Sequence, residues 1–221
     1  MSETLEVFGL TLSTMSEEEA AEQEVKEREE ELSRRREKLL EHYRSEASGV
    51  PRRYWNESLA TYQGEAVSQV MAFTKKKSGI LLLCGAPGTG KTHLGCGVIR
   101  ECGGYYTTLQ RLLYEVDSTM SFKAKETKIQ LLDRVCSYDT LVLDEVMRGV
   151  REDALRELAV FIISEFYANM KKLVIIGNPS KMEFVAWLGL AAKDRLNEMA
   201  EVIEFKCESF RPKKRTTFLK G

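Results

Sequence analysis

Residues 85–92 carry the strongest chemical signal in the sequence, because they match the phosphate-binding pattern G-x-x-x-x-G-K-[ST]. They follow an apolar run, residues 80–84, that is typical of a buried strand. Glycines let a loop turn its N–H groups toward an anion, and the helix expected to begin at Lys91 adds the positive end of its dipole. Lys91 can reach the β- and γ-phosphates of a nucleotide, and the Thr92 hydroxyl can ligate Mg²⁺.

The predicted nucleotide site covers the whole loop and the first turn of the helix after it. A glycine-rich turn with an unrelated lysine is the alternative, but the apolar run before the loop favours phosphate binding. We therefore expect ATP and Mg²⁺ as ligands. The predicted nucleotide-binding residues are Gly85, Ala86, Pro87, Gly88, Thr89, Gly90, Lys91, Thr92 and His93.

Two acidic residues, Asp144 and Glu145, end a second apolar run, residues 141–143. In P-loop ATPases the first acid at such a strand end holds Mg²⁺, so Asp144 and Thr92 are the predicted metal residues. The second acid can activate the attacking water, which makes Glu145 the candidate general base. An acid pair after a strand can also begin a helix, but the upstream P-loop favours the catalytic interpretation.

Asn178 follows a third apolar run, residues 173–177. The carboxyl ends of parallel strands share one edge of a sheet, where ligands bind. Asn178 is therefore a candidate for orienting the attacking water or the γ-phosphate. A turn-forming asparagine before Pro179 is an equally good interpretation of its position.

Composition indicates a soluble intracellular protein. The chain has 221 residues, 43% of them hydrophobic, and a formal net charge of −1, so binding to nucleic acid or membrane would need local patches. The N-terminus lacks a signal-peptide pattern, and no apolar run approaches the ~20 residues that cross a bilayer. The five cysteines include no C-x-x-C pair and only two histidines are present, which argues against a disulfide framework or a zinc site.

From residue 50 onward, segments with strand and helix patterns alternate. This order predicts an α/β domain, residues 50–221, with a parallel sheet and helices on both faces. The expected strands are 80–84, 105–108, 140–143, 173–177 and 202–205, and the expected helices are 65–75, 91–102, 109–117, 126–136 and 151–170.

Residues 1–49 form a predicted N-terminal extension. A capping box, Ser16 with Glu19, begins a long charged helix that we expect to end near Ala47. Its sparse apolar residues recur every seven positions, which fits either a partner-facing seam or a solvated helix held by ion pairs. The apolar segment 5–12 before it can be a strand, a staple on the domain or a docking peptide.

Together these motifs resemble the DnaC/IstB group of AAA+ ATPases, over roughly residues 50–211. The resemblance implies a P-loop AAA+ three-layer fold with a five-stranded parallel sheet, an N-terminal helical extension and little or no separate lid domain. The segments that carry it are 50–55 (Val-Pro-Arg-Arg-Tyr-Trp), 85–94, 105–113, 141–145 and 188–195 (Leu-Gly-Leu-Ala-Ala-Lys-Asp-Arg).

The resemblance also implies roles for three residues near the γ-phosphate. Asn178 matches the sensor 1 position, and Arg211 matches the sensor 2 arginine. Arg195 matches the arginine finger, which acts on ATP bound by a neighbouring subunit; a surface ion pair is the alternative for this residue. Helicase loaders often carry a second arginine four residues before the finger, where this chain has Ala191. The predicted catalytic residues are Lys91, Glu145, Asn178, Arg195 and Arg211.

Members of this group load ring helicases onto DNA or assist a transposase. The resemblance therefore implies a cytoplasmic ATPase of a bacterial or phage-infected cell that oligomerises on ATP and delivers a replicative helicase to single-stranded DNA. An IstB-type transposition helper is the alternative within the group, and a nucleotide-gated binding module without hydrolysis is the non-enzyme alternative. Candidate DNA contacts are Phe122, Lys123, Lys125 and Lys128, and the basic run 211–215.

Overall fold

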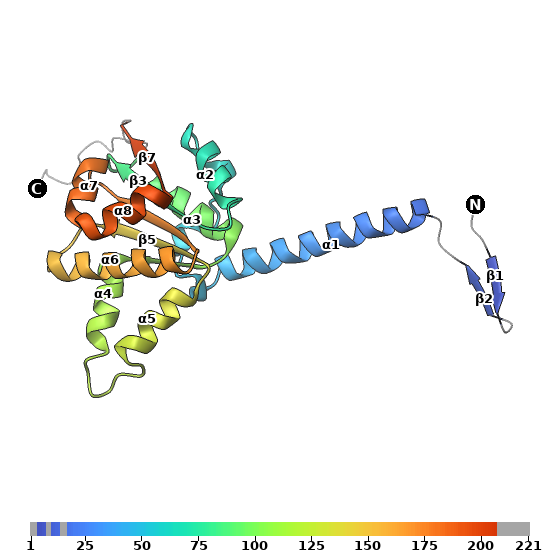
Figure 1. Cartoon of the computed structure of the whole chain (residues 1–221), viewed down its shortest axis with the longest axis horizontal. Helices are drawn as coiled ribbons and strands as arrows, with labels where there is room; N and C mark the ends of the chain where they lie inside the picture. Colours follow the sequence, from blue (N-terminus) through green and yellow to red (C-terminus); the bar gives the residue numbers. More distant parts are fainter. Residues whose placement is uncertain (1–3, 8–9, 14–16, 207–221) are drawn as a thin grey trace, which may run out of the picture. The chain divides into compact units, whose positions relative to one another are not determined.

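The computed structural model describes residues 4–7, 10–13 and 17–206 of the chain (Figure 1). By internal contacts the chain forms two units, Met1–Glu41 and His42–Gly221. The division precedes the predicted boundary at residue 49, because the residues that follow Glu41 pack on the second unit. The His42 imidazole Nε2 bonds the Gly104 carbonyl at 2.7 Å, and the Tyr43 hydroxyl donates to the Tyr54 carbonyl at 2.6 Å.

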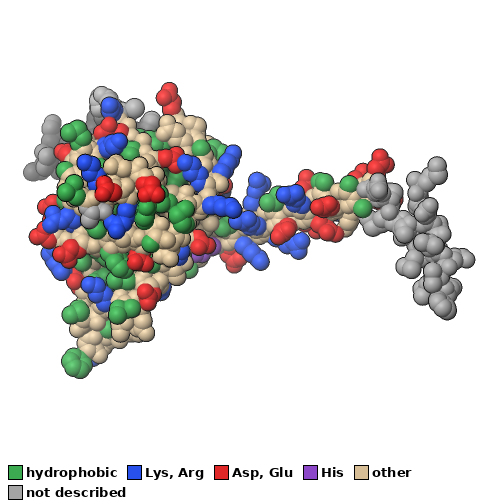
Figure 2. Space-filling model, viewed as in Figure 1, with side chains coloured by type: hydrophobic (Ala, Val, Ile, Leu, Met, Phe, Trp, Pro, Cys, Tyr) green, Lys and Arg blue, Asp and Glu red, His purple; other side chains and the backbone are tan. Residues whose placement is uncertain are grey.

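The first unit holds a hairpin and most of a long helix. Strands β1 (Thr4–Val7) and β2 (Leu10–Ser13) pair antiparallel, which agrees with the strand interpretation of this segment. Helix α1 (Glu17–Tyr43) is nearly all exposed, with Val25 at 58% and Leu32 at 52%. Figure 2 shows acidic and basic side chains interspersed along it. The capping residue predicted for this helix, Ser16, lies outside the described residues.

Helix α1 ends four residues before the predicted Ala47. The chain continues as a short 3-10 turn, η1 (Glu46–Ser48), and reverses at Gly49, which has φ +70°. A side chain at Gly49 would place its Cβ 2.0 Å from the Tyr106 carbonyl oxygen, so both backbone conformation and close packing require glycine here.

The second unit contains a five-stranded parallel sheet of order β4-β5-β6-β3-β7. This confirms the predicted number of strands and their parallel direction. The strands are β3 (Gly79–Gly85), β4 (Tyr105–Thr108), β5 (Thr140–Val146), β6 (Lys172–Gly177) and β7 (Ala200–Phe205). Strand β6 lies between β5 and β3, so the carboxyl ends of these three parallel strands are neighbours at one edge of the sheet.

In the part of this unit that the structure describes there are also seven α-helices and two more 3-10 turns. Helix α3 and strand β4 have the predicted bounds, whereas α7 and α8 were not predicted. The elements are η2 (Arg52–Tyr54), η3 (Leu59–Thr61), α2 (Ala66–Thr74), α3 (Lys91–Cys102), α4 (Leu109–Ser118), α5 (Lys128–Ser137), α6 (Glu152–Ala168), α7 (Lys181–Leu188) and α8 (Leu190–Met199). No helix in the part of the chain that the structure describes is long and apolar enough to cross a membrane.

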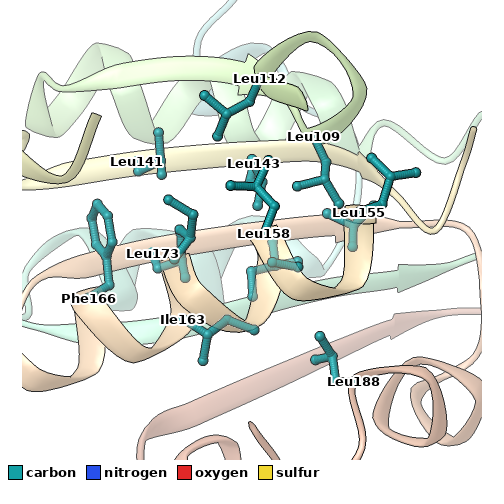
Figure 3. Packing of buried hydrophobic residues seen from close by; sticks show 14 of the residues in the cluster. Leu109, Leu112, Leu141, Leu143, Leu155, Leu158, Ile163, Phe166, Leu173 and Leu188 are labelled. Carbon is teal, nitrogen blue, oxygen red and sulfur yellow. The ribbon is translucent and has the colours of Figure 1, made fainter. Parts of the chain in front are cut away.

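The sheet is covered on both faces, which gives three layers (Figure 1). Helix α3 packs closely on one face, where a Cβ on Gly95 would lie 2.6 Å from the Ile176 side chain. Helices α4, α6 and α8 cover the other face and form the main hydrophobic core. Figure 3 shows side chains of α4 and α6 that meet those of β5 and β6, among them Leu109, Leu112, Leu141, Leu143, Leu155, Leu158, Phe166 and Leu173. This core holds the strand ends that carry the candidate site.

Candidate nucleotide-binding site

The predicted phosphate loop runs from the end of β3 into α3. Gly85, Gly88 and Gly90 have φ of +107°, +82° and +84°, a region of backbone conformation that favours glycine. Gly85 also lies against strand β7, since a Cβ there would be 2.3 Å from the Phe205 carbonyl oxygen. The Ala86 N–H donates to that same oxygen at 3.0 Å. The loop is therefore fixed both by its own glycines and by the neighbouring strand.

Lys91 is buried within the loop, with 4% of its surface exposed. Its ammonium donates to the carbonyl oxygens of Gly85 at 2.8 Å and Ala86 at 2.6 Å. Burial lowers the pKa of Lys91, while the nearby Asp144 carboxylate acts in the opposite direction. A buried cation held by loop carbonyl oxygens at the start of a helix is suited to pair with an anion such as a phosphate.

The Asp144 carboxylate accepts three hydrogen bonds beside the phosphate loop, and the residue is only 4% exposed. Its Oδ2 accepts from the Thr92 hydroxyl at 2.8 Å and from the Tyr106 hydroxyl at 2.7 Å. Its Oδ1 accepts from the Glu145 N–H at 2.6 Å. Burial, followed by the Asp144 charge and hydrogen bond, raises the pKa of the Tyr106 hydroxyl far above its usual range.

The pair Thr92 and Asp144 fits the ligand preferences of Mg²⁺. A hydroxyl and a carboxylate are hard oxygen ligands, and Mg²⁺ is usually held by one or two such groups together with waters and substrate phosphates. The described residues contain no cluster of three or more His, Cys, Asp or Glu side chains that could hold a metal without further ligands. In P-loop ATPases the nucleotide phosphates supply part of the Mg²⁺ coordination.

Glu145 lies beside Asp144 but in a different environment. Its φ is +54°, and the pairing of β5 with β6 shifts register between Leu143 and Val146. Such an irregularity redirects side chains at the end of a strand. The Glu145 carboxylate is 45% exposed and forms an ion pair with Arg148 at 3.0 Å. The candidate base is therefore open to solvent and held by a neighbouring cation.

A cavity of about 390 Å³ joins the P-loop to both acids. Asn178 lines it from the end of β6, so the structure brings together the P-loop, Asp144, Glu145 and Asn178. Several lining residues were not predicted from the sequence as site residues. The cavity is lined by Arg53, Tyr54, Glu57, Pro87, Gly88, Gly90, Lys91, Thr92, His93, Asp144, Glu145, Arg148, Ile176, Gly177 and Asn178.

His93 links helix α3 to residues 57–58, which precede α2. Its Nε2 donates to the Ser58 carbonyl at 2.7 Å, and its Nδ1 lies 3.6 Å from the Glu57 carboxylate. In the same segment the Tyr62 hydroxyl donates to the Thr89 carbonyl at 3.0 Å. Residues 57–62 therefore contact both the P-loop and the start of α3, although they were not singled out from the sequence.

The comparisons with known proteins agree with this geometry. The family described as IstB-like ATP binding protein matches residues 12–217. The chain belongs to this family. Among solved structures, the DnaC helicase loader has a TM-score of 0.62 and 26% identity, with 71% of this chain and 100% of that chain covered. The predicted family is confirmed.

Two more distant structures share the fold. DnaI has a TM-score of 0.54 and 20% identity, covering 73% of this chain and 94% of that chain. The replication initiator DnaA bound to AMPPCP and single-stranded DNA has a TM-score of 0.60 and 17% identity, covering 72% and 51%. These neighbours and DnaC confirm the predicted P-loop AAA+ fold. No curated protein sequence matches the chain.

The resemblance singled out two arginines, of which only Arg195 lies within the described residues. Arg195 lies half-buried on α8 and is absent from the lining of the cavity. It is near the Tyr167 hydroxyl, where it partly offsets the rise in pKa caused by the hydrogen bond to Glu198. Ala191 lies in α8 as well. Arg211 and the basic run 211–215 lie outside the described residues.

Proposed function

We propose that this IstB-like protein is an ATPase of the helicase-loader type, which assembles on single-stranded DNA when it binds ATP and delivers a replicative ring helicase. The observation that carries the proposal is the single cavity that joins Lys91, the Thr92–Asp144 pair and Glu145. The similarity to a DnaC helicase loader over its whole length favours a loader among ATPases with this fold.

The residues of the cavity have distinct proposed roles. Lys91 and the loop N–H groups bind the β- and γ-phosphates, and Thr92 and Asp144 hold Mg²⁺, which stabilises the charge that develops on the phosphates. Glu145 accepts a proton from the attacking water, and Asn178 orients that water or the γ-phosphate. Both residues line the cavity from adjacent strand ends, as these roles need.

Completion of the site is proposed to need a second subunit. Arg195 does not line the cavity of its own chain, which suits a finger acting on ATP bound by a neighbour. A guanidinium is always charged and its planar fork matches phosphate oxygens, so its arrival would stabilise the transition state. Arg211 is proposed to contact the γ-phosphate as sensor 2. ATP would thereby link assembly to hydrolysis.

The proposed contacts to DNA and to the helicase lie on exposed segments. Phe122 is fully exposed between α4 and α5 and is followed by Lys123, Lys125 and Lys128. Figure 2 shows hydrophobic side chains at the tip formed by the segment between α4 and α5. An aromatic ring with adjacent lysines is suited to stack on bases and to neutralise phosphates. The exposed apolar positions of α1, Val25 and Leu32, are proposed to contact the helicase.

A pull-down from the host with ATP present tests the proposal. We expect a replicative helicase to be recovered by the full chain and lost when residues 1–41 are deleted, while ATPase turnover of the deleted protein is unchanged. Recovery of a transposase instead would support the IstB-type transposition helper, the second function that the family match favours. Turnover that stays negligible with and without single-stranded DNA would support a nucleotide-gated binding module.

A further inference from the structure

Tyr106 makes a contact with the magnesium-binding pair that neither the sequence nor the comparisons assign. Its hydroxyl donates to Asp144 Oδ2 at 2.7 Å, and Thr92 donates to the same oxygen at 2.8 Å. Both ends of the tyrosine contact are shielded from water, with Tyr106 at 6% and Asp144 at 4% exposure. The bond joins neighbouring strands, because β4 pairs with β5 in a register that sets Tyr106 opposite Val142.

We propose that Tyr106 is a positioning residue that holds the Asp144 carboxylate in the orientation that Thr92 needs to bind Mg²⁺. This inference rests on the proposed ATPase function. A hydroxyl has one proton and two lone pairs. While Thr92 donates that proton to Asp144 Oδ2, its lone pairs remain for a cation. The metal site therefore depends on which way Oδ2 points.

The orientation of a carboxylate is weakly set by its own torsion, because terminal sp³–sp² torsions are broad and roughly two-fold. Besides Thr92, two donors hold the carboxylate here, one on each oxygen. The Glu145 N–H holds Oδ1 at 2.6 Å, and the Tyr106 hydroxyl holds Oδ2. Removal of the tyrosine donor would leave a buried carboxylate oxygen with one donor fewer, and the carboxylate would have more freedom to turn away from Thr92.

Tyr106 is itself rigidly placed. Its backbone lies between strand β5 on one side and Gly49 on the other, where no side chain would fit. The alternative role for its hydroxyl is structural, in which a buried tyrosine merely finds the nearest acceptor. The two roles differ in what they change. A structural role alters the stability of the fold, whereas a positioning role alters the dependence of nucleotide binding on Mg²⁺.

The test is Tyr106→Phe in the full chain, with Tyr105→Phe as the matched control. Tyr105 is the adjacent residue of β4, is also buried, and stacks on the Tyr138 ring at 5.1 Å in the main core. A fluorescent non-hydrolysable ATP analogue is bound first in EDTA and then with increasing Mg²⁺. For Tyr106→Phe we expect the half-saturating Mg²⁺ concentration to rise about tenfold, the scale of one hydrogen bond to a charged group.

Affinity for the analogue in EDTA should stay within about twofold of wild type for both variants, since Lys91 and the loop are untouched. A Mg²⁺ dependence of Tyr106→Phe equal to that of wild type would overturn the inference, as would an equal shift in Tyr105→Phe. A wild-type chain that fails to bind the analogue at any Mg²⁺ concentration would instead refute the proposed function, and this inference with it. Thermal melting of both variants reports any loss of stability separately.

Discussion

The two halves of the cavity differ in how deeply their side chains are buried within the fold of one chain. The phosphate-binding half is buried: Lys91 and Asp144 are each 4% exposed, and their hydrogen bonds are made within the fold. The half proposed to act in hydrolysis is open, with Glu145 and Asn178 both exposed at the ends of their strands. The groups proposed to bind the phosphates are therefore held within one chain, whereas those proposed to act on the γ-phosphate face solvent.

Backbone conformation shows the same contrast. The P-loop takes its positive φ values from glycines, which adopt them without strain. The segment after Asp144 takes them from Glu145, Met147 and Arg151, where a side chain makes them costly. Strain of this kind is typical of segments that change conformation in function. We therefore expect substitutions in the first half to abolish binding and those in the second half to affect turnover alone.

The largest effect is expected from Lys91→Ala. Loss of the buried ammonium should weaken ATP binding at least about a hundredfold and leave no measurable turnover, because charge-assisted bonds to phosphate are among the strongest in the site. Titration with a fluorescent ATP analogue measures this. Lys76→Ala, which removes a lysine that pairs with Glu201 on the surface, is the control and should bind like wild type. Affinity close to wild type in Lys91→Ala would contradict the P-loop assignment.

Glu145→Gln should separate the effect on turnover from the effect on ATP binding. Turnover should fall about a hundredfold, the usual contribution of a general base, while the affinity for ATP stays within about twofold. Steady-state hydrolysis and analogue binding are measured on the same preparation. Glu152→Gln, at the exposed start of α6, is the matched control. Turnover that persists in Glu145→Gln would show that another group accepts the proton.

Arg195→Ala should reduce turnover by more than about tenfold without loss of nucleotide binding, since an arginine finger stabilises only the transition state. Mixing this variant with Lys91→Ala should restore part of the activity. In such a mixture an intact P-loop of one subunit meets an intact arginine of the other. Absence of rescue at protein concentrations that support wild-type turnover would count against action between subunits.

The smallest effect is expected from Arg148→Ala. This change releases Glu145 from its ion pair, but the pair is exposed and the energy of such pairs is small. Turnover should therefore rise by no more than about threefold. Arg156→Ala, which removes a similar exposed pair with Asp153, should leave turnover unchanged. A large fall in Arg148→Ala would mean that Arg148 acts directly on the phosphates.

Local patterns predicted the fold where sequence signals are strong. Helix α3 was predicted with its observed bounds because a phosphate loop precedes it and Gly103 ends it. Helices α7 and α8, which Gly189 separates, were not predicted. A capping box, Ser180 with Glu183, was the available signal for α7.

Contacts between strands at the site could not be predicted from local sequence patterns. The P-loop and the two acids were recognisable because their chemistry lies in contiguous motifs. Tyr106 was not, since its contact with Asp144 exists only because β4 lies next to β5 in the sheet. The order of strands is set by tertiary packing and cannot be taken from the order along the chain. The roles of Arg195 and Arg211 remain predictions, because Arg195 is proposed to act on a neighbouring subunit and Arg211 lies outside the described residues.

The bond between the P-loop and β7 has a mechanical consequence. Among the described strands, β7 lies at the edge of the sheet and pairs with β3 alone. The carbonyl oxygen of its last residue, Phe205, accepts the Ala86 N–H at 3.0 Å. Tension on the chain beyond residue 206 would load the parallel β3–β7 bonds in shear and reach the phosphate loop through one residue. The Phe205 ring also lies 5.9 Å from the Lys91 ammonium. Force applied there would therefore pass from Phe205 to the phosphate loop at Ala86 and beside Lys91.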